Sequence, residues 1–189
     1  MAHMIPSVPM DFDDKSDEYI VFDALKRGLS DEYYVFHSVV VKFEHNKALE
    51  EREIDFVVLH KKKGMLLIEA KNGYDIYCSG RTWFYSSGKQ MKHGGPYNQI
   101  ESAKFAFRDK VKWHLNPEVQ ALDGKINMKH AVWFFGTTQN HFLAINRDEG
   151  LPEEASMALT MFREDLTNPQ KRIDEILGLK PAGLSDSAF

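Results

Sequence analysis

The chain has 189 residues, of which 43% are hydrophobic and 28% are charged, as is usual for one folded α/β domain. Its net charge of −4 argues against a protein that coats nucleic acid by charge alone, and no apolar run approaches the roughly 20 residues that cross a bilayer, so no membrane association is expected. The single cysteine, Cys78, excludes an internal disulfide and a thiolate zinc site, and it favours a reducing cytoplasm.

The predicted elements, in chain order, are bounded by a flexible leader over residues 1–16 and a flexible tail over 179–189. Periodicity and turn residues predict, in between, helices over 17–27, 96–114 and 169–177, strands over 33–43, 53–59, 65–71 and 130–135, and a hairpin over 75–85. Residues 140–151 carry no clear prediction. The order αβββαβ indicates one α/β domain over residues 17–178, with a central mixed β-sheet flanked by helices.

The strands over 53–59 and 65–71 are joined by a linker of hairpin length. A turn centred on Lys62 predicts three directly opposed pairs: Leu59 with Met65, Asp55 with Glu69, and Glu53 with Lys71. Opposed residues share one sheet face, with Cβ atoms roughly 5 Å apart, and two carboxylates at that spacing destabilise a sheet unless a positive charge lies between them. The simplest candidate is a hard divalent cation such as Mg²⁺.

Asp55 is itself unusual, because aspartate is depleted in strands and here lies between two apolar residues. Strand alternation places Ile54 on the opposite face, together with Phe56 and Val58. The alternative is a structural salt bridge from Glu53 to Lys71 at a solvated sheet margin, but that leaves the two facing acids unexplained. An Asp, a Glu and a Lys around a metal predict a hydrolytic site, with phosphodiesters as the expected substrates.

Two further polar residues lie beside apolar helix stripes. Glu18 begins the stripe of Phe22 and Leu25, and it is either a metal ligand or a solvated acid of the first turn. Gln99 lies in the first turn of the helix that Pro96 opens, and it either contacts phosphate or water or is an ordinary helix-start residue.

Several basic residues are candidates for contacts with nucleic-acid phosphates: Lys61, Lys62, Lys63, Lys92, Lys104 and Arg108. A lysine triplet in a hairpin turn is more often simply solvated. The chain contains no glycine-rich phosphate loop, no Gly-x-Ser-x-Gly elbow and no His-Glu-x-x-His motif, so no other catalytic pattern competes with the acid–lysine set.

Asp55, followed after 13 residues by Glu69-Ala70-Lys71, resembles the signature of the PD-(D/E)XK nucleases, although Ile54 stands where the signature has proline. The wider context is similar to the nuclease-related domain, NERD, over about residues 17–178. The segments that carry this resemblance are Glu18 to Leu25, Glu53 to Val58, Ile68 to Gly73, Trp83, and Pro96 to Gln99.

The resemblance implies a restriction-endonuclease-like core and Mg²⁺-dependent cleavage of DNA, with Mn²⁺ able to substitute. It implies these roles: Asp55, Glu69, the Ala70 carbonyl and Glu18 as metal ligands, Lys71 as the group that activates water, and Gln99 as a contact to water or phosphate. Family members often precede a helicase, so a helicase in cis or in trans is an expected partner in DNA processing or defence. A catalytically silent nucleic-acid-binding or helicase-docking module is the alternative, and an RNA or small-molecule phosphodiesterase is a third.

Overall fold

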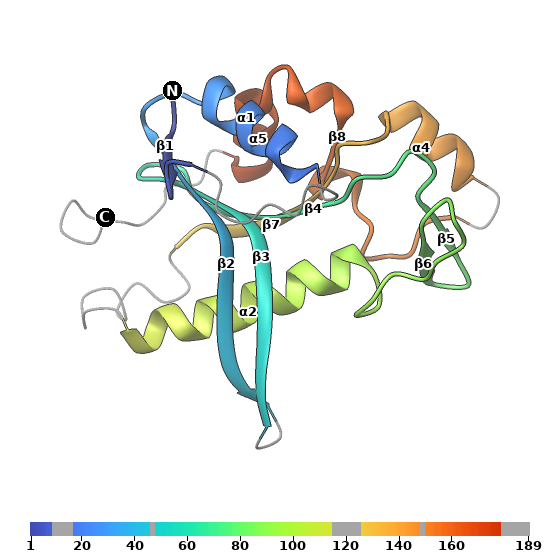
Figure 1. Ribbon diagram of the computed structural model, residues 1–189, viewed down its shortest axis with the longest axis horizontal. Helices are drawn as coiled ribbons and strands as arrows, with labels where there is room; N and C mark the ends of the chain where they lie inside the picture. Colours follow the sequence, from blue (N-terminus) through green and yellow to red (C-terminus); the bar gives the residue numbers. More distant parts are fainter. Residues whose placement is uncertain (9–16, 46–47, 115–125, 148–149, 179–189) are drawn as a thin grey trace.

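The computed structural model describes residues 1–8, 17–45, 48–114, 126–147 and 150–178. Its centre is a six-stranded mixed sheet in the order β1-β2-β3-β4-β7-β8, with a two-stranded sheet of β5 and β6 beside it (Figure 1). The strands are β1 His3–Ile5, β2 Tyr33–His45, β3 Ala48–His60, β4 Gly64–Ala70, β5 Tyr77–Ser79, β6 Thr82–Phe84, β7 Met128–Phe134 and β8 Thr160–Phe162. The α-helices of the described ranges are α1 Glu18–Gly28, α2 Pro96–His114, α4 Gln139–Ile145 and α5 Pro169–Leu177.

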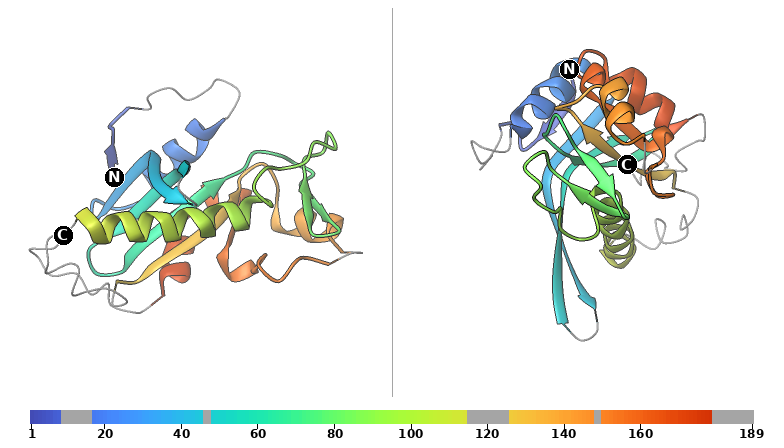
Figure 2. Two further views of the ribbon diagram at one scale, coloured as in Figure 1. Left: turned by 90° about the horizontal axis from the view of Figure 1, so that it is seen from below. Right: turned by 90° about the vertical axis from the view of Figure 1, so that its right-hand side faces the viewer.

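Helices flank both faces of the sheet, so each face has its own hydrophobic core (Figure 2). Helices α1 and α5 pack on one face, where Phe22, Leu25 and Ile173 are buried. Helix α2 packs on the other face through Tyr97 and Ile100. The predicted α/β fold is confirmed, and it is consistent with a restriction-endonuclease-like core. No helix of the described ranges is both long enough and apolar enough to cross a membrane.

Two strands and one α-helix of the described ranges lie where no element was predicted, as do the 3-10 helices Met157–Leu159 and Arg163–Leu166. Strand β1, inside the predicted leader, pairs in parallel with β2 and buries Met4. Helix α4 falls in the interval left open, and its first turn is capped by the Thr138 side chain, which accepts from the His141 N–H. Strand β8 has only three residues, all buried, too few to show alternation. Residues 9–16 of the predicted leader and the predicted tail, 179–189, lie outside the described residues.

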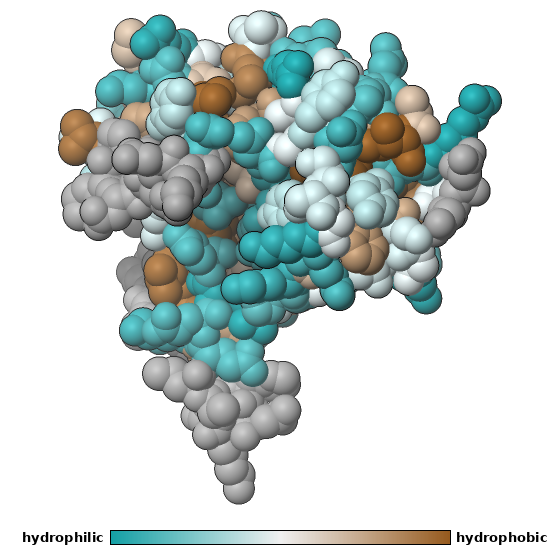
Figure 3. All heavy atoms as spheres, turned by 45° about the vertical axis from the view of Figure 1, so that its right-hand side comes forward, coloured by the Kyte–Doolittle hydropathy of each residue, from teal (hydrophilic) through white to brown (hydrophobic). Residues whose placement is uncertain are grey.

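Strands β2 and β3 form a long hairpin whose far half leaves the sheet and passes beside α2 as an arm (Figure 1). The β2–β3 ladder skips Ser38 and Asp55, and Ser38 has a left-handed backbone with φ of 52°. Beyond this point Ile54 packs into the core under α2, whereas Phe56 packs on the opposite face. The predicted common face of Ile54 and Phe56 is therefore wrong, because the hairpin twists locally. The visible surface of the arm is mainly hydrophilic (Figure 3).

The same twist ends the ladder between β3 and β4. That ladder runs from His60 opposite Gly64 to Phe56 opposite Ile68, and it confirms the predicted pair of Leu59 and Met65. It ends one position before Asp55, so the predicted strand pairs Asp55–Glu69 and Glu53–Lys71 do not form. Strand β3 instead diverges from β4 at the point where the charged residues begin.

Candidate active site

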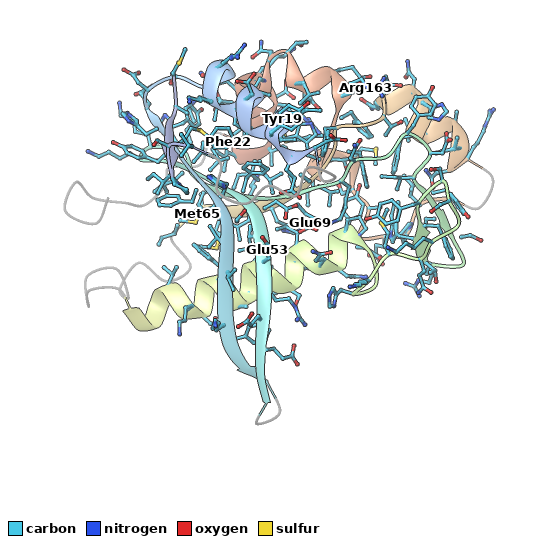
Figure 4. The ribbon with its side chains drawn as sticks, in the orientation of Figure 1. Tyr19, Phe22, Glu53, Met65, Glu69 and Arg163 are labelled. Carbon is cyan, nitrogen blue, oxygen red and sulfur yellow. The ribbon has the colours of Figure 1, made fainter. Side chains whose placement is uncertain are left out.

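The divergence of β3 from β4 creates the place where the predicted acids meet. The Asp55 carboxylate bridges the gap, since its Oδ2 accepts a hydrogen bond of 2.7 Å from the Ala70 N–H. Glu69, the residue before Ala70, stays in register with Val132 of β7 and is completely buried. Figure 4 shows Glu69 and Glu53 in the region between β3, β4 and α2. Asp55 and Glu69 are thus brought together by the hydrogen bond between the Asp55 side chain and the Ala70 backbone, and not by strand pairing.

Lys71 pairs with Glu69 and not with Glu53. Its Nζ donates a short hydrogen bond to Glu69 Oε1, and its side chain is only 18% exposed. Its backbone N–H donates to the Trp133 carbonyl at 2.9 Å, which fixes the residue just past the end of β4. The second carboxylate oxygen, Glu69 Oε2, is buried and has no hydrogen-bond partner among the described residues. Glu53 itself is exposed.

Burial raises the pKa of both acids, and a neighbouring acid adds to each shift: Asp55 at Glu69, and Glu53 at Asp55. Burial raises the pKa of Glu69, the negative charge of Asp55 raises it further, and Lys71 works in the opposite direction. Burial also raises the pKa of Asp55, although Lys71 and the Ala70 N–H favour its charged form. Burial alone would lower the pKa of Lys71, but the attraction of Glu69 and Asp55 outweighs it and raises that pKa. In this site, therefore, the lysine stays charged, and the two acids keep their protons up to a higher pH than the same side chains would in water.

Glu18, the first residue of α1, is a third acid close enough to act on this pair, because its charge also raises the pKa of Glu69. The residue before it, Asp17, has a left-handed backbone with φ of 54°. Asp17 Oδ2 accepts a hydrogen bond of 2.6 Å from Asn72 Nδ2, and Asn72 directly follows Lys71. We call this contact the Asp17–Asn72 bond. It ties the start of α1, and with it Glu18, to the end of β4.

The donor set at the site suits a hard divalent cation. Asp55 and Glu69 supply carboxylate oxygens, and the partnerless Glu69 Oε2 is a buried acceptor for which a cation would compensate. Within the described ranges no group of three or more His, Cys, Asp or Glu residues is arranged to hold a metal ion. The two carboxylates are accordingly the centre of the candidate site, and Glu18 does not form a three-acid cluster with them in this structure.

Two further polar residues lie on the α2 side of the sheet. Gln99 is half-buried in the first turn of α2, where its N–H donates to the Gly95 carbonyl at 3.0 Å. Tyr85, just after β6, lies near enough to Lys71 to contribute to its raised pKa. In the sequence, Tyr85 is simply the last residue of the hairpin predicted over 75–85. Its place beside Lys71 depends on how that hairpin folds back, which no local pattern records.

The basic candidates fall into two groups, one in the β3–β4 turn and one before or within α2. Lys61, Lys62 and Lys63 lie in the β3–β4 turn, and β4 has seven residues, so the triplet is about 20 Å from Glu69. Lys63 contacts α5, since its Nζ lies 2.7 Å from Asp174 Oδ1. The remaining three precede or belong to α2, on the side of the sheet that Glu69 faces: Lys92, Lys104 and Arg108. Lys104 Nζ lies 2.9 Å from His130 Nδ1.

Comparison of the chain with protein-family models matches residues 14–136 to NERD, the nuclease-related domain. The match covers more than half of the chain, and it includes the two acids of the pair, Glu18, Lys71 and Gln99. The chain matched no curated protein and no solved structure.

Proposed function

Since the chain belongs to the nuclease-related domain family, its function is nuclease-related, and we propose that it is a metal-dependent nuclease that hydrolyses phosphodiester bonds in DNA. The observation that carries this proposal is the Glu69 carboxylate. It is completely buried, one oxygen is bound by Lys71, and the other has no partner in the described part of the chain. A buried carboxylate in this state is costly unless a cation compensates it, and a cation-loaded acid pair beside a lysine fits phosphodiester hydrolysis.

Asp55 and Glu69 would hold Mg²⁺ or Mn²⁺, with the Ala70 carbonyl and Glu18 as further oxygen ligands. A cation bound there supplies a Lewis acid and lowers the pKa of a bound water. The Lys71 ammonium can donate three hydrogen bonds, and one goes to Glu69, so the others are available to the attacking water or to a phosphate oxygen. The Lys71 ammonium, which stays protonated in the site, would stabilise the negative charge that develops on the phosphate. Gln99 would orient water or phosphate from the start of α2.

The test is a cleavage assay on circular and linear DNA, single- and double-stranded, with Mg²⁺ and with Mn²⁺. We expect cleavage that EDTA abolishes and that Lys71→Ala or Asp55→Ala reduces at least about 100-fold. Glu51→Gln is the matched control, since Glu51 is an exposed acid of the same strand that pairs with Lys42 away from the site, and it should cut like the wild type. Circular dichroism confirms that each variant is folded.

Two outcomes would contradict the proposal. Cleavage that survives in Lys71→Ala, or in EDTA, would show that the acid–lysine site does not carry the activity. Folded wild-type protein that binds DNA but cuts none of these substrates would support a catalytically silent nucleic-acid-binding or helicase-docking module. From the family alone, we further propose that the protein acts with, or fused to, a helicase in DNA processing or defence.

A further inference from the structure

The bare backbone of Gly136 lies directly against the segment that follows Lys71. A Cβ built on Gly136 would be 2.5 Å from Asn72 Oδ1, 2.5 Å from the Gly73 nitrogen and 2.8 Å from the Gly73 oxygen. Non-bonded heavy atoms pack at about 3.5–4.0 Å, so no side chain fits between these residues. The φ angle of Gly136 is not in the left-handed region, so glycine is needed here for the close approach and not for an unusual backbone.

The side chain nearest to Gly136 is the one that tethers α1. Asn72 lies against Gly136 with its Oδ1, and its Nδ2 donates the hydrogen bond of 2.6 Å to Asp17 Oδ2. Asn72 directly follows Lys71, whose N–H donates to the Trp133 carbonyl at 2.9 Å. The end of β7 and the turn after it thus support both the backbone of Lys71 and the amide that binds Asp17.

Arg163 holds the turn that contains Gly136. It begins the 3-10 helix after β8 (Figure 4), and its Nη2 donates a short hydrogen bond to the Gly136 carbonyl. Its backbone N–H donates to the Thr137 carbonyl at 2.9 Å. Its guanidinium also lies over the ring of Tyr74, 5.7 Å from the centroid. One residue therefore binds the turn after β7 and the segment after Lys71 to each other.

We propose that Gly136 is a positioning residue of the candidate active site, and that Arg163 supports it. Gly136 sets where the Asn72 amide lies, and the Asp17–Asn72 bond in turn sets where Glu18 lies at the start of α1. This inference rests on the proposed function, since it takes Glu18 to be a metal ligand. It adds a requirement at residue 136, the last residue of the family match, and at residue 163, which lies beyond that match.

A single methyl group at residue 136 tests this role. Two of the three atoms that it would meet belong to the Gly73 backbone, which cannot turn aside as a side chain can. Asn72 and Gly73 must therefore shift, which weakens the Asp17–Asn72 bond and loosens the backbone hydrogen bond of Lys71. A general loss of stability has a different effect, since it speeds the exchange of all core amides together and leaves the metal affinity of the folded protein unchanged.

The test uses the full chain, first without metal and then with Mn²⁺. In Gly136→Ala we expect the Lys71 N–H to exchange with solvent at least about tenfold faster relative to the hydrogen-bonded amides of the β3–β4 ladder. We also expect Mn²⁺ to bind about fivefold more weakly, the loss that corresponds to one hydrogen bond. Hydrogen exchange followed by NMR measures the first quantity, and calorimetry measures the second.

Gly80→Ala is the matched control. An added Cβ at Gly80 has no atom within 4 Å, but the φ of 54° makes alanine strained there, so the protein loses stability without a change at the site. We expect its ratio of exchange rates and its Mn²⁺ affinity to stay within twofold of the wild type.

An unchanged ratio of exchange rates, or an unchanged Mn²⁺ affinity, in Gly136→Ala would overturn the role of Gly136. Should this variant fail to fold, Arg163→Met takes its place, because it removes the donor to the Gly136 carbonyl and adds no atom beside Asn72. It should change both quantities in the same direction by at least about twofold, and no change in them would equally overturn the role.

The same measurements separate this inference from the proposed function. A wild type that cuts no DNA refutes the nuclease, and the two measurements still decide on Gly136. If the wild type also binds no Mn²⁺, the exchange of the Lys71 N–H decides alone. Cleavage by the wild type, together with unchanged exchange and unchanged Mn²⁺ affinity in Gly136→Ala, refutes the role of Gly136 alone.

Discussion

The buried carboxylate of Glu69 is the group of the site whose burial is most unfavourable for the stability of the fold. It is fully buried beside Asp55, and only one of its oxygens is bound by Lys71. A buried acid can compensate by keeping its proton, by pairing with a cation, or by both. The protein uses both means, because Lys71 is present and the pKa of Glu69 is still raised. This sets the pH behaviour of the metal-free protein.

Glu69→Gln should change how stability depends on pH. The folded protein holds the Glu69 proton to higher pH than the unfolded chain, whose glutamate titrates near 4.5. Wild-type stability therefore falls as pH rises from that value through the raised folded pKa, and a glutamine removes this loss. We expect the stability of Glu69→Gln relative to wild type to increase by at least about 1.4 kcal/mol, the equivalent of one pKa unit, between pH 5 and pH 8. Denaturant unfolding of both proteins in EDTA, at pH 5 and at pH 8, measures their free energies of unfolding. If the difference between the two proteins is the same at both pH values, the prediction is wrong.

Metal binding should release protons from the same pair. The raised pKa values of Asp55 and Glu69 mean that a cation must displace protons that isolated acids would already have lost. We expect net proton release when Mn²⁺ binds at pH 7, and an affinity that weakens as pH falls from 8 to 6. Calorimetric titration in buffers of different ionisation enthalpy measures both. Binding heats that are the same in all buffers would show that the pair is already ionised.

At the scale of elements, the site depends on contacts between segments that are distant in the chain. Strand β3 leaves β4 at Asp55, α1 begins next to the end of β4, and the Asp17–Asn72 bond joins the two. The charge of Glu18 acts unfavourably on ionised Glu69, so a tether helps to keep the start of α1 next to the end of β4. Asn72 provides that tether from the position next to Lys71.

Asn72→Ala should weaken Mn²⁺ binding by about fivefold, which corresponds to the roughly 1 kcal/mol of one hydrogen bond. The effect should disappear in the Glu18→Gln background, because the tether acts through Glu18. Asn98→Ala is the matched control, since Asn98 is an exposed asparagine whose Nδ2 donates to the Gly94 carbonyl at 3.0 Å. Calorimetry of the four proteins of the cycle measures the coupling. Additive losses would mean that Asn72 does not position Glu18.

The sequence predicts the longer elements well and the contacts between them poorly. The bounds of α2 and α5 are as predicted, since proline at the start of each and Gly178 after α5 are local signals. The neighbourhood of Asp55 and Glu69 is also predicted, because a short turn fixes the hairpin register. The twist at Ser38, the ion pair of Lys71 with Glu69 and the place of Tyr85 are not predicted, since each depends on the tertiary structure around it, which no local pattern records.

At the scale of the whole molecule, the folded core extends beyond the range that the family shares. The match ends at residue 136, yet Met161 of β8 and Ile173 and Leu177 of α5 are buried in the core of the α1 face. The Trp133 side chain reaches the same region, where its Nε1 donates to the Phe162 carbonyl at 2.8 Å. The segment after residue 136 therefore completes the structure that holds the site.

A chain ended after residue 136 should not fold cooperatively, because it exposes the apolar surface that β8 and α5 cover. A chain ended after residue 178 is the control, and we expect it to unfold at the temperature of the full chain, in keeping with a domain over residues 17–178. Thermal unfolding followed by circular dichroism compares the three proteins. A cooperative transition in the shortest chain would show that the family range folds alone.

The position of β4 between β3 and β7 also has a consequence for the order of folding. Pairing of β4 with β3 closes a turn of a few residues, whereas pairing of Met65 with Met128 of β7 closes more than 60 residues. Closing the longer loop costs more chain entropy, so we expect the β3–β4 hairpin to form first. Asp55 and Glu69 then meet early, while Lys71 is anchored only when its N–H reaches Trp133. During folding, Asp55 and Glu69 would therefore come together before the Lys71 ammonium reaches its final position beside them.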